Sequence, residues 1–302
     1  VSDGRRQTVS IIKPFLYSLA MIDGASPCDQ VLHVQRTYRL DNGQTWTPRN
    51  TNHRRVGEMV SIQWGLQNSD NWVTAELMSR TSPLTFKRLL ESYGLRGPIE
   101  ATMAMSLGTP EATVGEMVSG YTTFVNDGVR VDPILVTQIE DMHGNIVATF
   151  APKMTEVLTA DAAHKMLYML QNVVNGGTGG RLRSSFGLQM PLGGKTGTTQ
   201  NNSDTWFMGF TPDLVAGCWV GGEERSVRFN SMAFGQGAAA ALPIFGKFLK
   251  KVYGDSKLGY LANIPFQLPE GFSPCYDAGN SDEAVEIYAG VNPDSTSSYT
   301  PF

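Results

Sequence analysis

Apolar residues recur at three- and four-residue spacing in several segments of the chain, and this periodicity predicts amphipathic helices. Residues 10–23 carry the clearest pattern, and Gly24 is expected to end that helix. Pro14 should lie in the first turn, where its missing N–H costs least. The same reasoning predicts helices over residues 56–68, 72–80, 84–93, 111–126, 159–174 and 237–253.

Other stretches have the alternation or the β-branched content that is typical of strands. Residues 31–48 alternate around Asn42-Gly43, a favoured pair in two-residue hairpin turns. Residues 129–150 are β-rich and should turn at His143-Gly144-Asn145. Short turns separate three further predicted strands, which should therefore run antiparallel: about 192–199, 205–210 and 214–221.

The expected fold class is α+β, with an antiparallel sheet flanked by helices and a mostly helical lobe. Residues 1–254 hold all of these elements and form one expected domain. From residue 255 the chain is rich in Pro, Ser, Asp and Gly. Residues 255–302 are therefore expected to be a poorly ordered tail.

Charge and composition exclude some classes of function. The formal net charge of the 302 residues is −4, and only 17% are charged, so the chain lacks the footprint of a protein that binds nucleic acid or anionic lipid. No apolar run approaches the ~20 residues that span a bilayer, and the first six residues are too polar for a signal peptide. An exported protein would need a targeting segment upstream of residue 1.

Cysteine and histidine give little evidence for metal chemistry. The three cysteines stand at unrelated spacings, and a Cys28–Cys275 bridge stays open for an oxidising compartment. No His-x-x-x-His pair is present, so neither a metal nor another cofactor is expected. Polar turns or helix surfaces should hold the histidines, which argues against a Ser-His-Asp triad: His33, His53, His143 and His164.

Three short motifs follow one another along the chain: Ser10-Ile11-Ile12-Lys13, Ser69-Asp70-Asn71 and Lys195-Thr196-Gly197-Thr198. Each is weak alone, because the first is also an ordinary helix pair, the second a turn and the third an exposed strand. Together and in this order they form the S-x-x-K, S-D-N and K-T-G set of serine penicillin-recognising enzymes. A phosphate-binding loop is excluded at Lys195, because the preceding glycines do not fit and no helix follows.

The chemistry of the set is coherent. Ser10 and Lys13 share a helix face, and a buried lysine whose pKa falls can act as the base for a serine nucleophile. Lys195 would be a second cation that lowers the pKa of Lys13 further. Ser69 would pass a proton between Lys195 and a leaving amine, and Asn71 would hydrogen-bond a substrate amide.

The strand that follows Lys195 is expected to bind substrate. A peptide would lie along its edge as an added strand, beside Thr196, Gly197, Thr198 and Thr199. Glycine in such a strand often marks a close backbone approach. The backbone N–H groups of Ser10 and Thr198 would form an oxyanion hole.

On these motifs the chain resembles the transpeptidase domain of class A penicillin-binding proteins. Residues 6–15 are similar to the active-serine segment of that family, and GKTGTT at 194–199 with DTWFMGFTP at 204–212 is the most specific match. The match covers about residues 5–252. Weaker similarities are WTPRN at 46–50, LGTPE at 107–111, YTTF at 121–124 and GTG at 177–179.

The resemblance implies attack on the D-Ala-D-Ala end of a peptidoglycan stem peptide, release of D-Ala, and transfer to an amine of a neighbouring strand. It implies acylation of Ser10 by β-lactams. It also implies a place in the cell envelope, on the periplasmic face of the inner membrane, with a membrane anchor and a glycosyltransferase domain on the N-terminal side that this sequence does not contain.

Two departures from the family pattern stand out. Thr8-Val9 replace the usual Pro-Gly before the active serine, and only nine residues precede Ser10, so the two strands that come before the serine helix in the family are expected to be missing. The competing functions are a D,D-carboxypeptidase or a β-lactamase on the same fold, or a non-catalytic penicillin-binding or sensing module. No Glu-x-x-x-Asn-type loop, which a class A β-lactamase needs for deacylation, lies between Asn71 and Lys195.

Overall fold

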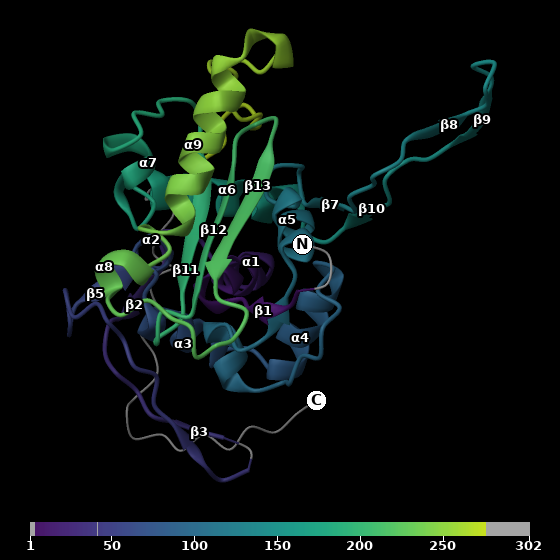
Figure 1. Cartoon of the computed structure of the whole chain (residues 1–302). Coiled ribbons are helices and arrows are strands. Elements are labelled where there is room, and N and C mark those ends of the chain that lie inside the picture. The colour runs from purple at the N-terminus through teal and green to yellow at the C-terminus, as the bar shows by residue number, and fades with distance from the viewer. Residues whose placement is uncertain (1–3, 41, 276–302) are drawn as a thin grey trace.

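The computed structural model describes residues 4–40 and 42–275. Three antiparallel strands run through the middle of the molecule: β11 (Gly193–Thr198), β12 (Asp204–Phe210) and β13 (Val215–Gly221) (Figure 1). β12 is the central strand and pairs with both neighbours. The three strands and their antiparallel order confirm the sequence prediction.

Helices make up most of the remaining regular structure, and the helices predicted over 10–23, 72–80, 84–93, 111–126, 159–174 and 237–253 are confirmed with shifted ends. The first predicted helix divides into a 3₁₀ helix, Val9–Ile12, and α1 (Lys13–Ile22). The others are α2 (Ile62–Gln67), α3 (Asn71–Met78), α4 (Pro83–Ser92), α5 (Val114–Thr122), α6 (Ala160–Gly176), α7 (Arg181–Ser184), α8 (Met232–Gly235) and α9 (Ala241–Gly254). Two more 3₁₀ helices are Met103–Leu107 and Ser256–Leu258.

The helices pack on both faces of the sheet. Trp206, Met208 and Phe210 of β12 enter the core that contains the apolar side chains of α1, α5 and α6. Phe207 points the other way, into a second core with α7 and α9. Both faces are thus buried, which explains why β12 reads as a nearly continuous apolar run.

Local capping explains where two of the helices begin. Thr113 and Glu116 form a capping box at the start of α5, in which each side chain accepts a hydrogen bond from the other residue's backbone N–H. The Thr159 hydroxyl accepts from the N–H of Ala162 at the start of α6. Pro14 lies in the first turn of α1, as predicted.

The remaining strands are short and antiparallel. The hairpin predicted over residues 31–48 is confirmed in its central part, where β3 and β4 pair around the predicted turn, whereas β2 pairs with β5. Residues 59–61 belong to β5 and not to the helix predicted over 56–68. The strands are β1 (Arg6–Gln7), β2 (Gln30–Leu32), β3 (Tyr38–Arg39), β4 (Thr45–Trp46), β5 (Met59–Ser61), β6 (Glu111–Ala112), β7 (Val129–Val131), β8 (Gln138–Glu140), β9 (Ile146–Thr149) and β10 (Met154–Glu156).

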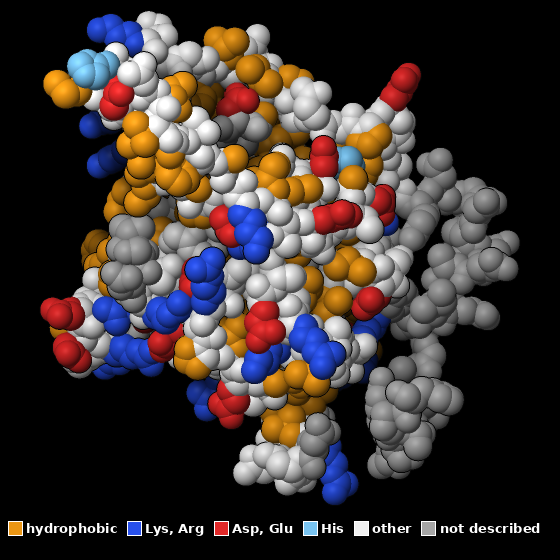
Figure 2. Space-filling view, turned by 90° about the vertical axis from the view of Figure 1, so that its right-hand side faces the viewer, with side chains coloured by type: hydrophobic (Ala, Val, Ile, Leu, Met, Phe, Trp, Pro, Cys, Tyr) orange, Lys and Arg blue, Asp and Glu red, His pale blue; other side chains and the backbone are white. Residues whose placement is uncertain are grey.

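The β-rich segment predicted over 129–150 is an arm. β8 and β9 pair as a hairpin that projects from the body of the molecule (Figure 1). The turn lies at His143-Gly144-Asn145, as the sequence predicted, and Gly144 has a φ of +82°. On the face shown in Figure 2, acidic and basic side chains lie close to one another, in keeping with scattered charge.

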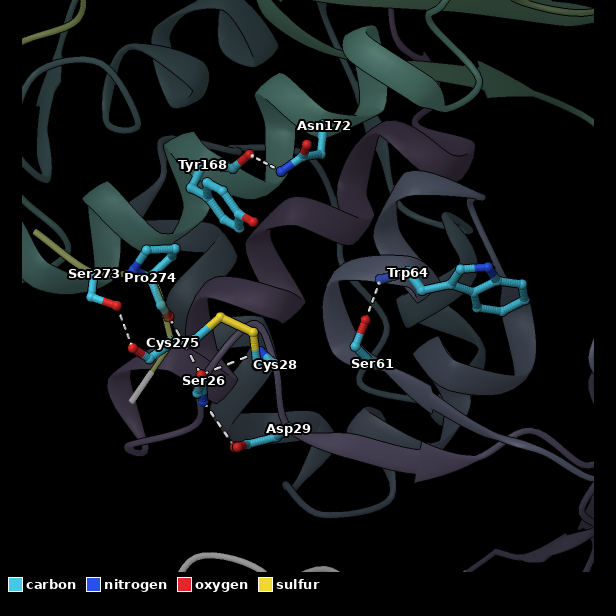
Figure 3. Close-up of a disulfide and its surroundings, with 10 residues drawn as sticks. All are labelled: Ser26, Cys28, Asp29, Ser61, Trp64, Tyr168, Asn172, Ser273, Pro274 and Cys275. Carbon is cyan, nitrogen blue, oxygen red and sulfur yellow. Dashed lines mark hydrogen bonds between the residues drawn. A yellow bond between two sulfur atoms is a disulfide. The ribbon is translucent and has the colours of Figure 1, made fainter. Parts of the chain in front are cut away.

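The chain beyond α9 returns to the body of the domain. Cys28 and Cys275 form a disulfide that ties this segment to the loop after α1 (Figure 3). The Phe266 ring contacts Phe210 of β12. Residues 255–275 therefore differ from the expected poorly ordered tail, because a covalent bond and an aromatic contact hold them without any helical or strand pattern in the sequence. Residues 276–302 lie outside the described part, and the domain boundary at residue 254 stays a prediction.

Candidate active site

Ser10 lies in the 3₁₀ helix that leads into α1, half-buried in the wall of a cleft. Within the described residues the Ser10 hydroxyl makes no hydrogen bond. Val9, just before it, has a φ of +44°, which is unusual for a β-branched residue. The serine thus sits at a sharp bend that directs its side chain into the cleft.

Four long-range hydrogen bonds hold the bend in place. The N–H groups of Thr8 and Val9 donate to the carbonyls of Pro110 and Gly108, at 2.9 and 3.1 Å. The Tyr121 hydroxyl donates to the Ile11 carbonyl at 2.7 Å, and the Trp206 indole N–H donates to the Gln7 carbonyl at 2.9 Å. Gly108 is required here, because a Cβ atom on it would lie 2.1 Å from the Cα of Val9.

Lys13 reaches from α1 to the second motif and is fully buried. Its Nζ atom donates to the Ser69 carbonyl at 2.7 Å, to Asn71 Oδ1 at 2.6 Å and to the Asp70 carbonyl at 3.3 Å. Burial lowers the pKa of the Lys13 ammonium to about 7, and the charge of Asp70 opposes part of this shift. A neutral amine keeps two donors for the two short bonds and frees its lone pair for a proton.

The second motif forms the turn between α2 and α3, with Ser69 at a φ of +55°. Asp70 is fully buried and caps α3 through Oδ1, which accepts from the N–H groups of Trp72 and Val73. Its Oδ2 accepts from Asn50 Nδ2 at 2.7 Å and lies 2.9 Å from His33 Nε2. Asp70 is thereby the residue that holds the turn in place.

The sequence predicted that His33 lies in a polar turn or on a helix surface, and this prediction is wrong. Its side chain is fully buried beside Asp70, between the rings of Trp64 and Trp72. The Nδ1 atom is buried without a hydrogen-bond partner among the described residues. Because an ionised carboxylate only accepts hydrogen bonds, Nε2 is the donor in the bond to Asp70.

Lys195, on β11, reaches the same turn from the other side. Its Nζ donates to Ser69 Oγ at 2.8 Å and to the Thr196 carbonyl at 3.1 Å. Burial lowers the pKa of Lys195 well below its ordinary value, and the charge of Lys13 lowers it further. The sequence predicted a charge repulsion between Lys13 and Lys195, and this repulsion disfavours two charged lysines in the site.

The edge of β11 lines the cleft. Thr196 donates to the Thr178 hydroxyl at 2.7 Å, and the Thr198 hydroxyl accepts from the N–H of Gly237 at 2.8 Å. Gly197 allows the close packing that the sequence predicted, because a Cβ there would lie 2.7 Å from a methyl group of Val9. The strand is thus packed directly against the serine segment.

Thr199 also touches the cleft, but its hydroxyl is used by the turn after β11. It accepts from the N–H groups of Ser203 and Asp204, both at 2.9 Å. This residue shapes the end of the strand. Its contact with substrate remains a prediction.

The cleft has a volume of about 500 Å³. The predicted residues Ser10, Ser69, Asn71, Thr196, Thr198 and Thr199 line it, and Lys13 and Lys195 lie buried beneath. The sequence reasoning missed the lining contributed by Arg49, Asn50, Thr51, Asn68, Thr178, Gln200, Met232, Gln236 and Ala238. In the sequence the WTPRN segment is distinguished only by its family similarity, because its position beside the serine depends on tertiary packing.

Two other properties of the described residues bear on the site. No group of His, Cys, Asp or Glu side chains within 4–40 and 42–275 is placed to hold a metal ion. None of the helices in this part of the chain has the length and apolar character needed to cross a membrane.

Comparison with protein families decides the kinship. The family model "Penicillin binding protein transpeptidase domain" matches residues 2–220. The chain belongs to this family. Its relatives include Penicillin-binding protein 1A of Neisseria gonorrhoeae, 29% identical over 253 residues, and Penicillin-binding protein 1A of Aquifex aeolicus (strain VF5), 30% identical over 251 residues. These relatives confirm the expected kinship with class A penicillin-binding proteins.

The penicillin-binding transpeptidase fold is also confirmed. The crystal structure of Penicillin-Binding Protein 1A from Haemophilus influenzae matches with a TM-score of 0.78 at 22% identity, over 89% of this chain and 44% of that chain. The alignments with the Neisseria and Aquifex relatives cover 81% and 82% of this chain but only 31% and 33% of those proteins. The chain thus spans about a third of the length of these relatives.

Proposed function

We propose that this chain is a peptidoglycan D,D-transpeptidase domain that works through an acyl-enzyme on Ser10. One observation carries the proposal: three motifs far apart in the sequence meet at one cleft, with a nucleophile, two buried lysines and a bridging serine. The family and the penicillin-binding protein 1A relatives support the same reaction class. The substrate is the D-Ala-D-Ala end of a stem peptide.

The acylation step begins with proton transfer from Ser10 Oγ to the neutral Nζ of Lys13. The Oγ atom attacks the carbonyl carbon between the two D-Ala residues, and the carbonyl oxygen takes the negative charge. The backbone N–H groups of Ser10 and Thr198 are the proposed donors to that oxyanion. The C–N bond then breaks, and the leaving amine takes a proton through Ser69 and Lys195.

Lys195 has a second proposed role in holding the terminal carboxylate of the substrate. A carboxylate that enters beside Thr196 and Thr198 would raise the pKa of Lys195 and stabilise its charged form. Lys195 is then the cation of the complex, and Lys13 is the neutral base. Asn71 would bind the amide on the acyl side, because its Nδ2 keeps one N–H after donating to the Arg49 carbonyl.

In the second step the amine of another stem peptide attacks the ester carbonyl and gives up a proton through Ser69 to Lys195. The ester C–O bond breaks, the amide cross-link forms, and Ser10 Oγ takes back its proton from Lys13. The location in the cell envelope, the membrane anchor and a covalently linked glycosyltransferase domain are proposals that rest on the penicillin-binding protein 1A relatives. The disulfide between Cys28 and Cys275 supports an oxidising, extracytoplasmic compartment.

A transpeptidase is favoured over a β-lactamase because no carboxylate side chain lines the cleft within the described residues, and none is therefore placed to activate a deacylating water. A D,D-carboxypeptidase and a non-catalytic penicillin-binding module remain the other candidates. A fluorescent penicillin separates a β-lactamase from the other candidates. We expect a stable label; rapid release would indicate a β-lactamase, and absence of label would contradict the proposal.

Release of D-Ala from a stem pentapeptide, measured with and without an amine acceptor, separates the remaining candidates. A transpeptidase makes a cross-linked product, a carboxypeptidase makes the tetrapeptide only, and a sensing module makes neither.

A further inference from the structure

Arg49 stands out among the residues of the cleft. It is exposed, and it is the one charged side chain among the lining residues of the described chain. Lys13 and Lys195 are completely buried below the surface of the cleft. The open surface of the site therefore carries a cation at one position and no carboxylate.

The backbone of Arg49 is fixed, whereas its guanidinium is unengaged. Its carbonyl accepts from Asn71 Nδ2 at 2.7 Å. On either side of it, Asn50 Nδ2 donates to Asp70 Oδ2, and the Pro48 carbonyl accepts from the indole N–H of Trp72. Within residues 4–40 and 42–275 the guanidinium makes no hydrogen bond or ion pair. Arg49 is suited to bind a ligand anion beside the proposed substrate-binding amide of Asn71. Its backbone is already held by hydrogen bonds and needs no ordering on binding.

The anion in question differs from the terminal carboxylate of the proposed substrate. That carboxylate belongs at the β11 side, with Lys195, Thr196 and Thr198. Arg49 lies on the side of Asn71, where the acyl portion of the substrate would bind. We propose that Arg49 binds a second carboxylate, carried by the acyl portion, so that the site selects acyl donors with a free acid group next to the reacting D-Ala-D-Ala end. This inference rests on the proposed function.

The expected effect is moderate. An exposed arginine paired with a carboxylate contributes a small interaction free energy, and bidentate geometry adds to it, so a loss of about three- to tenfold in acylation efficiency follows from removing the charge. The effect should weaken as salt rises, because both groups are exposed to solvent.

Two penicillins provide the test. Carbenicillin differs from benzylpenicillin only by a carboxylate on the side-chain carbon next to the amide. The second-order acylation rate is measured with both compounds for the parent protein, Arg49→Gln, Arg49→Lys and Arg54→Gln. Arg54 is a matched control, because it is exposed, lies five residues away and does not line the cleft.

We expect Arg49→Gln to lower the carbenicillin rate about three- to tenfold more than the benzylpenicillin rate. Arg49→Lys should recover part of the difference, and Arg54→Gln should leave the ratio of the two rates unchanged. An unchanged ratio in Arg49→Gln, or an equal change in Arg54→Gln, would overturn the proposal. If neither compound acylates the parent protein, the proposed function itself fails, and the role of Arg49 falls with it.

Discussion

The pH dependence of acylation is set by Lys13, because only its neutral form can accept the proton of Ser10. The structure buries this amine completely, which lowers its pKa to about 7. Below that value the neutral fraction falls about tenfold for each pH unit. The acylation rate should therefore rise about tenfold between pH 6 and pH 8 and level off above pH 8.

Asp70 offers a way to move this profile in a known direction. Its negative charge raises the pKa of Lys13, so removing the charge should lower that pKa further. Asp70→Asn keeps an oxygen that can cap α3 and removes the charge. The rising limb of the profile should move to lower pH, which means that the variant retains more of its maximal rate at pH 6 than the parent does.

The assay is the second-order rate of labelling by a fluorescent penicillin from pH 5.5 to 9 at constant ionic strength. Tryptophan fluorescence at each pH and a thermal melt of each variant show whether the fold is retained. The penicillin carboxylate is ionised throughout this range, so it does not produce the limb. A rate that is flat between pH 6 and pH 8, or a limb that moves to higher pH in Asp70→Asn, would refute Lys13 as the base.

Three further outcomes are expected. Gly108→Ala should lower both the melting temperature and the acylation rate, because its Cβ would collide with the serine segment, whereas Gly144→Ala at a similar φ has open space and should cost only about 1 kcal/mol of stability; equal effects would contradict the role of the contact. His33→Ala should reduce the acylation rate, and His33→Gln, which can present an N–H near the position of Nε2, should recover part of it; equal rates in the two variants would show that the hydrogen bond does not matter. Replacing Cys28 and Cys275 by Ser should cost about 2–4 kcal/mol in chemical denaturation, because the bridge closes a long loop, and no change in the denaturation midpoint would show that it adds nothing.

Much of the fold could be predicted, because its signals are local. Thr159 marks the start of α6 through its own hydroxyl, and the continuous apolar run of β12 reflects burial on both faces. The three motifs could be found because each needs only a few consecutive residues. Their order in the chain was enough to place a nucleophile, a base and a substrate strand in one proposed site.

The failures share a cause: they depend on residues far apart in the sequence. Residues 59–61 form a strand because Val60 pairs with Val31, which a periodicity read along one segment does not reveal. His33 is buried beside Asp70, and the hydrogen bond between them crosses 37 positions of sequence. The segment after α9 has no regular pattern, and a disulfide across 247 positions holds it.

The most direct test of the central claim is the site of the β-lactam adduct. The intact protein is incubated with benzylpenicillin, digested and analysed by mass spectrometry, in parallel with Ser10→Ala. We expect one adduct, on the peptide that contains Ser10, and none in the variant. An adduct on another residue, or one that persists in Ser10→Ala, would contradict the assignment of Ser10 as the nucleophile.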